Sequence, residues 1–389
     1  MSGGGRPRGL PLQSRDDRAV YVPLAAVLAG LLWCIGAIDV NEPQPERFGL
    51  LLVGGLLALA AARGAGIGAL ACVYAVAIAA AERLAREPLA QGSDVIPATR
   101  EAIEVVLAGG NPYTHVLQST IPVGSPFPYP PGELLFYLPA YVVTGGIDRV
   151  ETWSGILTTA AIAAAGARAG FALAALPAML YATWGVAAFR TVDGGNDVSA
   201  ALLVVISLAA LALRPRAAFV VSALALGWAL AFKAFAVLVL PIVLRHLAVA
   251  RAPWRAYAAI AIGTAATMSV PFLVRDPAAF VSQQLAALTF HDEVWGTNVL
   301  HALATSGVDH APLLPAFFVL EVALALAALG VALFARLSTI GRSALAAAIV
   351  IAVPLLLARW TTQSYYVYAA TLALAGLALF DEPAAVRAD

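Results

Sequence analysis

Residues 313–335 read LLPAFFVLEVALALAALGVALFA, an almost unbroken apolar run. A helix of roughly 20 such residues crosses a bilayer hydrocarbon core about 30 Å thick. The whole chain shares this character, because 61% of its 389 residues are hydrophobic and 12% are charged. Soluble domains have roughly 45–50% and 25%. The composition therefore predicts an integral membrane protein and excludes a soluble one.

Further apolar runs bounded by charge, Gly or Pro predict an all-α, polytopic protein of about twelve transmembrane helices. Residues 1–19 are expected to be a disordered cytoplasmic N-terminus, 20–381 a single transmembrane domain, and 382–389 a cytoplasmic tail. The predicted helices are 20–38, 49–62, 66–84, 151–168, 170–189, 197–213, 217–232, 233–245, 255–274, 313–335, 343–358 and 364–380.

The run 133–146 decides the topology. It is too short to cross, so we expect a helix that lies at the membrane interface or dips into it. With a cytoplasmic N-terminus, this assignment leaves the outer face acidic and collects arginines in the short inner loops, as the positive-inside rule requires. These arginines are Arg6, Arg8, Arg15, Arg18, Arg63, Arg168, Arg214, Arg216, Arg245, Arg251, Arg255, Arg336 and Arg342.

The basic residues are arginines apart from Lys233, and Ala, Gly and Val are abundant, which is typical of a GC-rich bacterial genome. We therefore expect a protein of the bacterial inner membrane. A formal net charge of zero argues against nucleic acid as a partner. Cys34 and Cys72 lie inside apolar runs and predict neither a disulfide framework nor a metal site.

Two polar segments, 85–150 and 275–312, are too long to be simple connectors. Both are predicted on the outer side of the membrane, where they would cover the ends of the helices. In the first, Asp94 lies about ten residues beyond a membrane helix. A carboxylate at the boundary of a low-dielectric site can take a proton from an acceptor hydroxyl. The alternative is an exposed interfacial aspartate or an N-cap for the helix predicted over 97–108.

The order of a membrane helix, Asp94, an amphipathic helix, Gly110-Asn111-Pro112-Tyr113 and Phe127-Pro128-Tyr129-Pro130-Pro131 resembles the GT-C superfamily of membrane glycosyltransferases. The resemblance covers roughly 67–380. It is strongest to bacterial envelope enzymes that use polyprenyl-phosphate mannose or arabinofuranose. It implies interfacial helices in a long first outer loop, Asp94 as catalytic base, and Asn111, Tyr113 and Tyr129 at the sugar or acceptor. The predicted helices 20–38 and 49–62 are extra to this pattern.

Two cations are expected at the donor phosphate. Lys233 lies between apolar runs, much like the lysine-then-proline helix pair of the superfamily, and a lysine at membrane depth needs a partner. Snorkelling to the lipid head groups is its alternative. Arg359 precedes the last helix against the positive-inside trend and can hold a phosphate with two hydrogen bonds. Beside it, Gln363, Tyr365 and Tyr366 are expected to bind sugar or acceptor, although an interfacial aromatic belt explains the tyrosines equally well.

Further polar residues complete the predicted site. Asp193 and Asp197 fall where the superfamily often places a second acidic residue; Asp193 is the better candidate, since capping the following helix explains Asp197 at least as well. In the second outer loop, His291, Trp295 and Asn298 suit sugar binding and equally suit a solvated loop. No metal site is predicted, although a divalent cation shared by Asp94 and Asp193 is left open; no other cofactor is expected.

These residues predict a transferase that moves a sugar, mannose or arabinofuranose, from a polyprenyl-phosphate donor to an envelope glycolipid, polysaccharide or glycoprotein. The reaction would be an inverting displacement on the extracytoplasmic face. A transporter or flippase of a lipid-linked sugar is the alternative, because an intramembrane lysine also suits a substrate path. A non-catalytic assembly subunit is a third interpretation.

Overall fold

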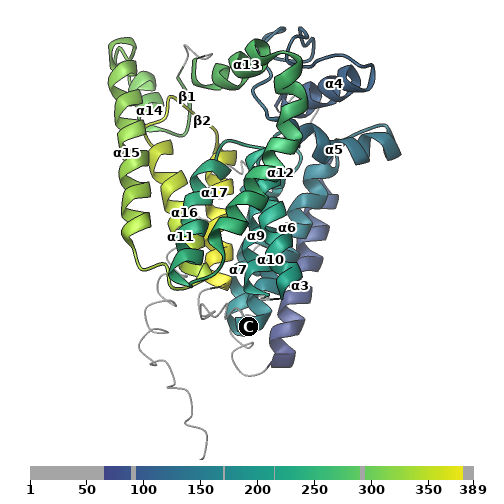
Figure 1. The fold of residues 1–389 in the computed structure, drawn as a ribbon, viewed down its shortest axis with the longest axis vertical. Helices are drawn as coiled ribbons and strands as arrows, with labels where there is room; N and C mark the ends of the chain where they lie inside the picture. The colour runs from purple at the N-terminus through teal and green to yellow at the C-terminus, as the bar shows by residue number, and fades with distance from the viewer. Residues whose placement is uncertain (1–64, 89–92, 170, 214, 290–293, 380–389) are drawn as a thin grey trace, which may run out of the picture. The chain divides into compact units, whose positions relative to one another are not determined.

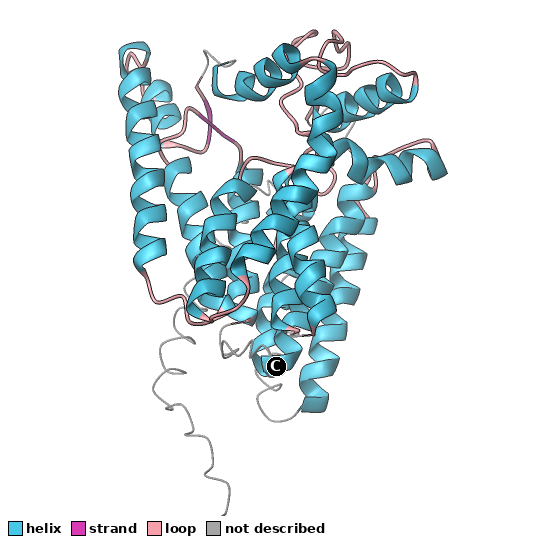
Figure 2. Cartoon of the chain, in the orientation of Figure 1, coloured by secondary structure: helices cyan, strands magenta, loops and turns pink. Residues whose placement is uncertain are grey.

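A computed structural model describes residues 65–88, 93–169, 171–213, 215–289 and 294–379 (Figure 1). The predicted helices 20–38 and 49–62, both terminal segments, Cys34 and His291 lie outside these residues. The described chain is mostly helical (Figure 2). Its helices are α3 (Ala65–Leu84), α4 (Val95–Leu107), α5 (Pro131–Thr144), α6 (Val150–Ala169), α7 (Phe171–Thr183), α8 (Gly185–Phe189), α9 (Asp197–Ala212), α10 (Arg216–Leu230), α11 (Ala236–Val249), α12 (Trp254–Arg275), α13 (Pro277–Thr289), α14 (Val299–Thr305), α15 (Leu314–Phe334), α16 (Ile340–Leu355) and α17 (Gln363–Ala378), with a 3₁₀ turn η1 (Ala311–Leu313).

Each predicted helix from 66–84 onward coincides with a helix of the structure, and 170–189 is divided into α7 and α8 at Trp184. Within the described ranges, three helical stretches are long and apolar enough to span a membrane, namely Ile67–Leu84, Trp254–Arg275 and Ala311–Phe334. Four shorter apolar helices accompany them, α9, α10, α11 and α16. The total of about twelve crossings stays a prediction.

Helix α9 is the most enclosed element of the bundle, since nearly all its residues are buried. It packs against α6, α10 and α17. Close approach depends on small residues, as at Gly227 of α10, where a Cβ would collide with the backbone oxygen of Ala261 in α12. By contrast, α12 and α15 expose most of their side chains, as expected of helices that face lipid.

Arg83 ties α3 to α7 inside the bundle. Its guanidinium is fully buried and donates hydrogen bonds to the carbonyl oxygens of Tyr181 (3.1 Å) and Ala182 (3.1 Å). These carbonyls belong to the last turn of α7, where a helix leaves its acceptors unsatisfied and carries negative dipole charge. Arg83 therefore caps the end of α7 from a neighbouring helix, just before the helical path is interrupted at Trp184.

Helix α5 corresponds to the run 133–146 that decides the topology. Its 14 residues rise about 21 Å at ~1.5 Å each, less than a bilayer core of about 30 Å. Arg149, just before α6, donates hydrogen bonds to the Arg86 carbonyl oxygen (2.6 Å) and to Glu87 (2.6 Å), just after α3. The segment between Glu87 and Arg149 thus begins and ends at the same end of the helices, as the non-crossing assignment requires.

The two long polar segments contact each other at that end. Arg275 donates to the carbonyl oxygens of Gly109 (2.7 Å) and Gly110 (2.9 Å), and the Phe127 backbone N–H donates to Gln283 (2.7 Å). Helices α4, α5 and α13 lie at the same end of the bundle, and α14 lies alongside that end of α15 (Figure 1). We call this end of the bundle the loop end.

A short parallel pair of strands joins the second polar segment to the last helix. Strand β1 (Trp295–Gly296) pairs with β2 (Trp360–Thr361), with Trp295 opposite Trp360. Gly296 has φ +106°, and a side chain there would collide with the Thr361 carbonyl oxygen. Only glycine fits such a position, so this residue sets the approach of the loop to the start of α17.

Candidate functional site

Lys233 lies at the loop end, in the non-helical turn between α10 and α11. Its ammonium nitrogen lies 2.7 Å from Asn196 Oδ1 and 2.5 Å from Asp197 Oδ1. The side chain is 11% exposed, and that of Asp197 is 5% exposed. Lys233 is therefore a largely buried, paired cation, and this environment differs from that of a lysine that snorkels to the lipid head groups.

Three aromatic rings surround the Lys233 ammonium. The nitrogen lies 5.2 Å from the ring centre of Tyr365, 5.9 Å from that of Tyr129 and 6.0 Å from that of Phe235. Distances of this size allow cation–π attraction. An ammonium has three N–H donors. Asn196 accepts one of these hydrogens and Asp197 forms an ion pair with the ammonium, so at least one donor is left for an anion such as a phosphate oxygen.

The start of α9 supplies the partners of Lys233. Asn196 occupies the N-cap position, yet its side chain makes no capping hydrogen bond and accepts from Lys233 instead. Asp197 falls in the first helical turn rather than at the cap. The capping interpretation of Asp197 is therefore wrong, and the residue is the counter-ion of Lys233.

Asp94 occupies the N-cap position of α4 without capping it, because its side chain makes no cap hydrogen bond. One carboxylate oxygen accepts from the Ile121 backbone N–H (2.7 Å), and the residue is half-buried. The adjoining backbone packs on the turn before α9, where the Ile96 N–H donates to Gly194 O (2.9 Å). Gly194 has φ +86°, and a Cβ there would lie 2.6 Å from Ser93 O. A non-glycine residue at 194 would push the Asp94 segment away.

Tyr129 connects the two candidate catalytic groups. Burial raises the pKa of the Tyr129 phenol well above its ordinary value, and the nearby charge of Asp94 adds a smaller contribution of the same sign. The ring of Tyr129 is also one of the three that surround the Lys233 ammonium. The charge of Asp94 therefore acts on the same phenol whose ring lies 5.9 Å from the Lys233 ammonium.

Glu133, in the first turn of α5, is a member of the site that the sequence did not reveal. Its side chain is fully buried, and Oε1 lies 2.5 Å from the Thr99 hydroxyl oxygen. Burial raises the pKa of Glu133 to about 8, although Thr99, Lys233 and Asn196 each act to lower it. The only signal in the sequence was a carboxylate directly after Pro130-Pro131-Gly132, at the start of an apolar run.

Asp193 and Gln363 are both held by Arg190. The Arg190 guanidinium donates to Asp193 Oδ2 (2.7 Å) and to Gln363 Oε1 (2.5 Å). The other oxygen of Asp193 accepts from the Gly195 N–H (3.0 Å). Burial raises the pKa of Asp193 and Arg190 opposes that rise. These contacts fix the turn before α9 against the start of α17, and Arg190 was absent from the predicted site.

Arg359 has a different electrostatic neighbour from Lys233. Its guanidinium lies close enough to Glu321 of α15 for their charges to interact. Its backbone oxygen accepts from the Trp295 N–H (3.2 Å) and so joins the strand pair. The structure thus places Arg359 beside α15 and Lys233 beside α9.

Several predicted sugar-binding residues have structural contacts at the loop end. Asn111 Oδ1 accepts from the Tyr113 N–H (3.2 Å), and the buried Tyr113 donates from its hydroxyl to Tyr129 O (2.9 Å). Tyr113 also packs edge-on against Phe280 of α13, with 5.0 Å between ring centres. Asn111 and Tyr113 therefore fix the path of the chain that carries Tyr129.

The remaining candidates lie around the strand pair. Asn298 caps α14 by accepting from the His301 N–H (2.7 Å), and Tyr366 donates to Thr297 O (2.9 Å). Trp295 is 56% exposed, with its ring centre 6.4 Å from that of Trp360. Among these, Trp295 has the free ring surface that could lie against a sugar.

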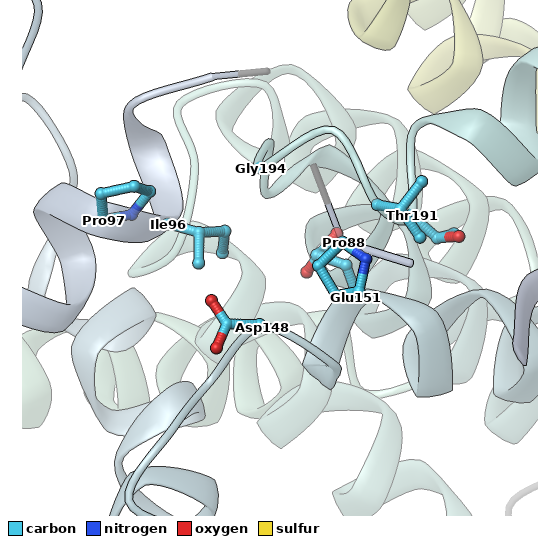
Figure 3. Close-up of a pocket in the computed structure, with 8 residues that line it drawn as sticks. Pro88, Ile96, Pro97, Asp148, Glu151, Thr191 and Gly194 are labelled. Atoms are coloured by element: carbon cyan, nitrogen blue, oxygen red, sulfur yellow. The ribbon is translucent and has the colours of Figure 1, made fainter. Parts of the chain in front are cut away.

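A small pocket of about 120 Å³ adjoins the contact between Asp94's segment and the turn before α9. Glu151, in its wall, is buried and accepts from the Tyr137 hydroxyl (2.5 Å), the Ser199 N–H (3.1 Å) and the Ser199 hydroxyl. Asp148 is exposed, and its carboxylate points toward Ile96 (Figure 3). The lining is Pro88, Ile96, Pro97, Asp148, Glu151, Thr191, Val192 and Gly194. None of the described residues in contact with the Lys233 ammonium belongs to it.

Within the described ranges, no group of three His, Cys, Asp or Glu side chains could hold a metal ion. Cys72 is a buried free thiol of α3.

No known family model matches this chain. No curated protein matches it either. Among solved structures, it is similar to the crystal structure of ArnT from Cupriavidus metallidurans in the apo state, with a TM-score of 0.48 and 18% sequence identity over 80% of this chain and 59% of that one. The chain thus spans about three-fifths of the length of that structure, and a likeness of this size assigns it neither an activity nor a substrate.

Proposed function

We propose that this protein is a membrane glycosyltransferase that takes a sugar from a polyprenyl-phosphate donor. The observation that carries the proposal is the arrangement around Tyr129, whose ring lies 5.9 Å from the Lys233 ammonium and whose phenol is influenced by the charge of the half-buried Asp94. A base and a phosphate-binding cation are the two groups that displacement from a sugar phosphate requires. The order of motifs from Asp94 to Pro131, which resembles the GT-C superfamily, supports the same reaction.

In the proposed reaction, Asp94 removes the proton from an acceptor hydroxyl as its oxygen attacks the anomeric carbon. The bond from that carbon to the phosphate oxygen breaks, and its electron pair stays on the departing polyprenyl phosphate. The spare N–H of Lys233 stabilises this negative charge. A single displacement of this kind inverts the configuration at the anomeric carbon. Asp94 suits the role of base because, within the described part of the chain, one of its oxygens accepts from the Ile121 N–H and the other is left to take a proton.

The substrate contacts are proposed in finer detail. Tyr129 and Tyr365, whose rings flank Lys233, would lie against the sugar or the first isoprene unit, and Trp295 against the acceptor. Arg359 would serve as a second phosphate ligand only if the donor phosphate reaches toward α15. Mannose and arabinofuranose are the proposed sugars, and an envelope glycolipid, polysaccharide or glycoprotein the proposed acceptor.

The proposed location is the outer face of the bacterial plasma membrane. Arg245 donates to Leu333 O (2.9 Å), and His246 contacts Leu337 O (2.9 Å), so the arginine-bearing ends of α11 and α15 meet. Because α11 starts beside Lys233 and runs away from it, these arginines lie at the end opposite the loop end. The positive-inside rule then assigns the loop end to the outside.

The test is to incubate the full-length protein, reconstituted in liposomes, with radiolabelled polyprenyl-phosphate mannose or arabinofuranose and an envelope lipid fraction. Transfer of label to an acceptor, lost in D94N, supports the proposal. Movement of intact donor between leaflets without transfer would instead identify a flippase. Neither transfer nor movement, with donor still bound, would reject both activities.

A further inference from the structure

The contacts of the Thr99 hydroxyl bear on the protonation of Glu133. The Thr99 hydroxyl oxygen is 2.7 Å from Val95 O and 2.5 Å from Glu133 Oε1. A hydroxyl has one hydrogen, and a backbone carbonyl can only accept. If Thr99 donates to Val95 O, the short contact with Glu133 needs a second hydrogen, which an ionised carboxylate does not have. The contact is satisfied when Glu133 is a neutral acid that donates to Thr99.

The carboxyl of Glu133 is also influenced by the charge of Lys233. Glu133 Oε2 and Asn196 Nδ2 are both buried without a well-formed hydrogen bond, and the Asn196 side chain is close enough to influence the carboxyl. The amide oxygen of Asn196 accepts from Lys233 (2.7 Å). Its amide nitrogen is therefore the group available to donate to a neutral Glu133. Both atoms would then be satisfied, as buried polar groups normally are.

We propose that Glu133 is held as a neutral carboxylic acid and acts as a positioning residue, linking Lys233 through Asn196 and Thr99 to the backbone beside Asp94. The four hydrogen bonds of this series all run in the same direction. Lys233 donates to Asn196, Asn196 to Glu133, Glu133 to Thr99, and Thr99 to the Val95 carbonyl oxygen. The inference deepens the proposed function, because it names the residue that aligns the phosphate-binding cation with the candidate base.

Ionisation of Glu133 would break this alignment. A carboxylate at Glu133 would accept from Thr99 and so withdraw its hydrogen from Val95 O. It would also place a second buried negative charge near Lys233, which already has Asp197 as counter-ion. The site would then repel a phosphate. Because burial raises the pKa of Glu133 to about 8, its ionisation falls in a pH range that is accessible to experiment.

The other groups near Glu133 must be separated from it in any titration. The charged neighbours are Lys233 and Glu151, and burial raises the pKa of each neighbouring tyrosine further above 10. These tyrosines are Tyr113, Tyr129 and Tyr137. A transition near pH 8 that E133Q removes therefore belongs to Glu133, since Glu151 is unchanged in that variant.

The sole lysine of the chain gives a readout that does not depend on activity. Full-length protein labelled with [ε-¹³C]lysine should show a single Lys233 signal by NMR, and we expect its position to shift as the pH passes about 8. E133Q should lose this shift. E104Q, which changes an exposed carboxylate of α4, should keep it. No shift in the wild type, or a shift retained in E133Q, overturns the proposal.

The binding of decaprenyl monophosphate, without a sugar, tests the consequence. Wild-type affinity should fall about tenfold for each pH unit above the pKa of Glu133. E133Q should remove this alkaline fall and E104Q should retain it, whereas E133A should weaken binding at every pH. An alkaline fall that persists in E133Q overturns the positioning role. If the NMR shift and the binding behave as expected but no sugar is transferred, the inference stands and the proposed function fails.

Discussion

Lys233 and Asp197 form a buried ion pair at the loop end, with 2.5 Å between Nζ and Oδ1. The lysine comes from the turn between α10 and α11, and the aspartate from the first turn of α9. Removing one partner leaves the other charge buried and uncompensated. The pair therefore joins two helices and also holds the only ammonium at the proposed phosphate position.

We expect K233M and D197N each to destabilise the protein by roughly 3–5 kcal/mol, as breaking a buried ion pair does. The double variant K233M/D197N should recover most of this loss, because neither charge remains. Donor binding should nevertheless stay weak in K233M and in the double variant. Thermal unfolding in detergent and donor affinity measure the two effects. Full donor binding by the double variant would show that Lys233 is only structural.

Replacing Asp94 tests the candidate base. D94N should lower kcat by about 10²–10⁴-fold, the usual contribution of a general base. The asparagine oxygen can still accept from the Ile121 N–H, so thermal stability and donor affinity should change little. E104Q, on the exposed side of the same helix, is the matched control and should keep full kcat. A D94N enzyme with wild-type kcat would move the base to another residue.

The ion pair between Arg149 and Glu87 makes a prediction about topology. Because the chain returns to the same end of the bundle, E104C and D148C should both react with a membrane-impermeant maleimide added to intact cells. The background would carry C34S and C72S. R255C, at the opposite end, should react only after permeabilisation. Labelling of E104C and D148C from opposite sides would mean that α5 crosses the membrane.

The sequence predicted the described helices well because each is a long apolar run ended by charge, Gly or Pro, as at 197–213 and 255–274. It also predicted that 133–146 would be a separate short helix. The number of crossings was harder to predict, since α9, α10 and α11 have only 14–16 residues each. Helices of that length depend on their neighbours and the local bilayer, which composition does not describe.

The candidate site was predicted in part. Lys233 and Asp94 stand out because charge is rare in apolar surroundings and because the motifs around Asp94 follow a recognisable order. Glu133 and Asn196 do not stand out, since each looks like an ordinary residue at a helix start. Their roles arise only when α4, α5, α9 and the α10–α11 turn meet, and no spacing along the chain encodes that meeting.

Gly132 sets the distance between α5 and α10 beside Lys233. Its N–H donates to Ala231 O (2.7 Å), and its own carbonyl oxygen accepts from the Trp228 indole (2.8 Å). A Cβ at this position would lie 2.5 Å from Ala231 O, too close for any side chain without backbone movement. We therefore expect G132A to destabilise the protein by about 1–3 kcal/mol, as overpacking does. Donor affinity should fall as well, because the shift moves Glu133 away from Asn196.

G330A is the matched control for this substitution, since a Cβ there meets no atom within 4 Å. It lies inside α15, where alanine is favoured over glycine by roughly 0.5–1 kcal/mol, so its thermal stability should be unchanged or slightly higher. Unfolding temperature and donor affinity, measured on both variants in the same detergent, separate the two positions. If G132A matches G330A in both measurements, contact between α5 and α10 is not what aligns Lys233.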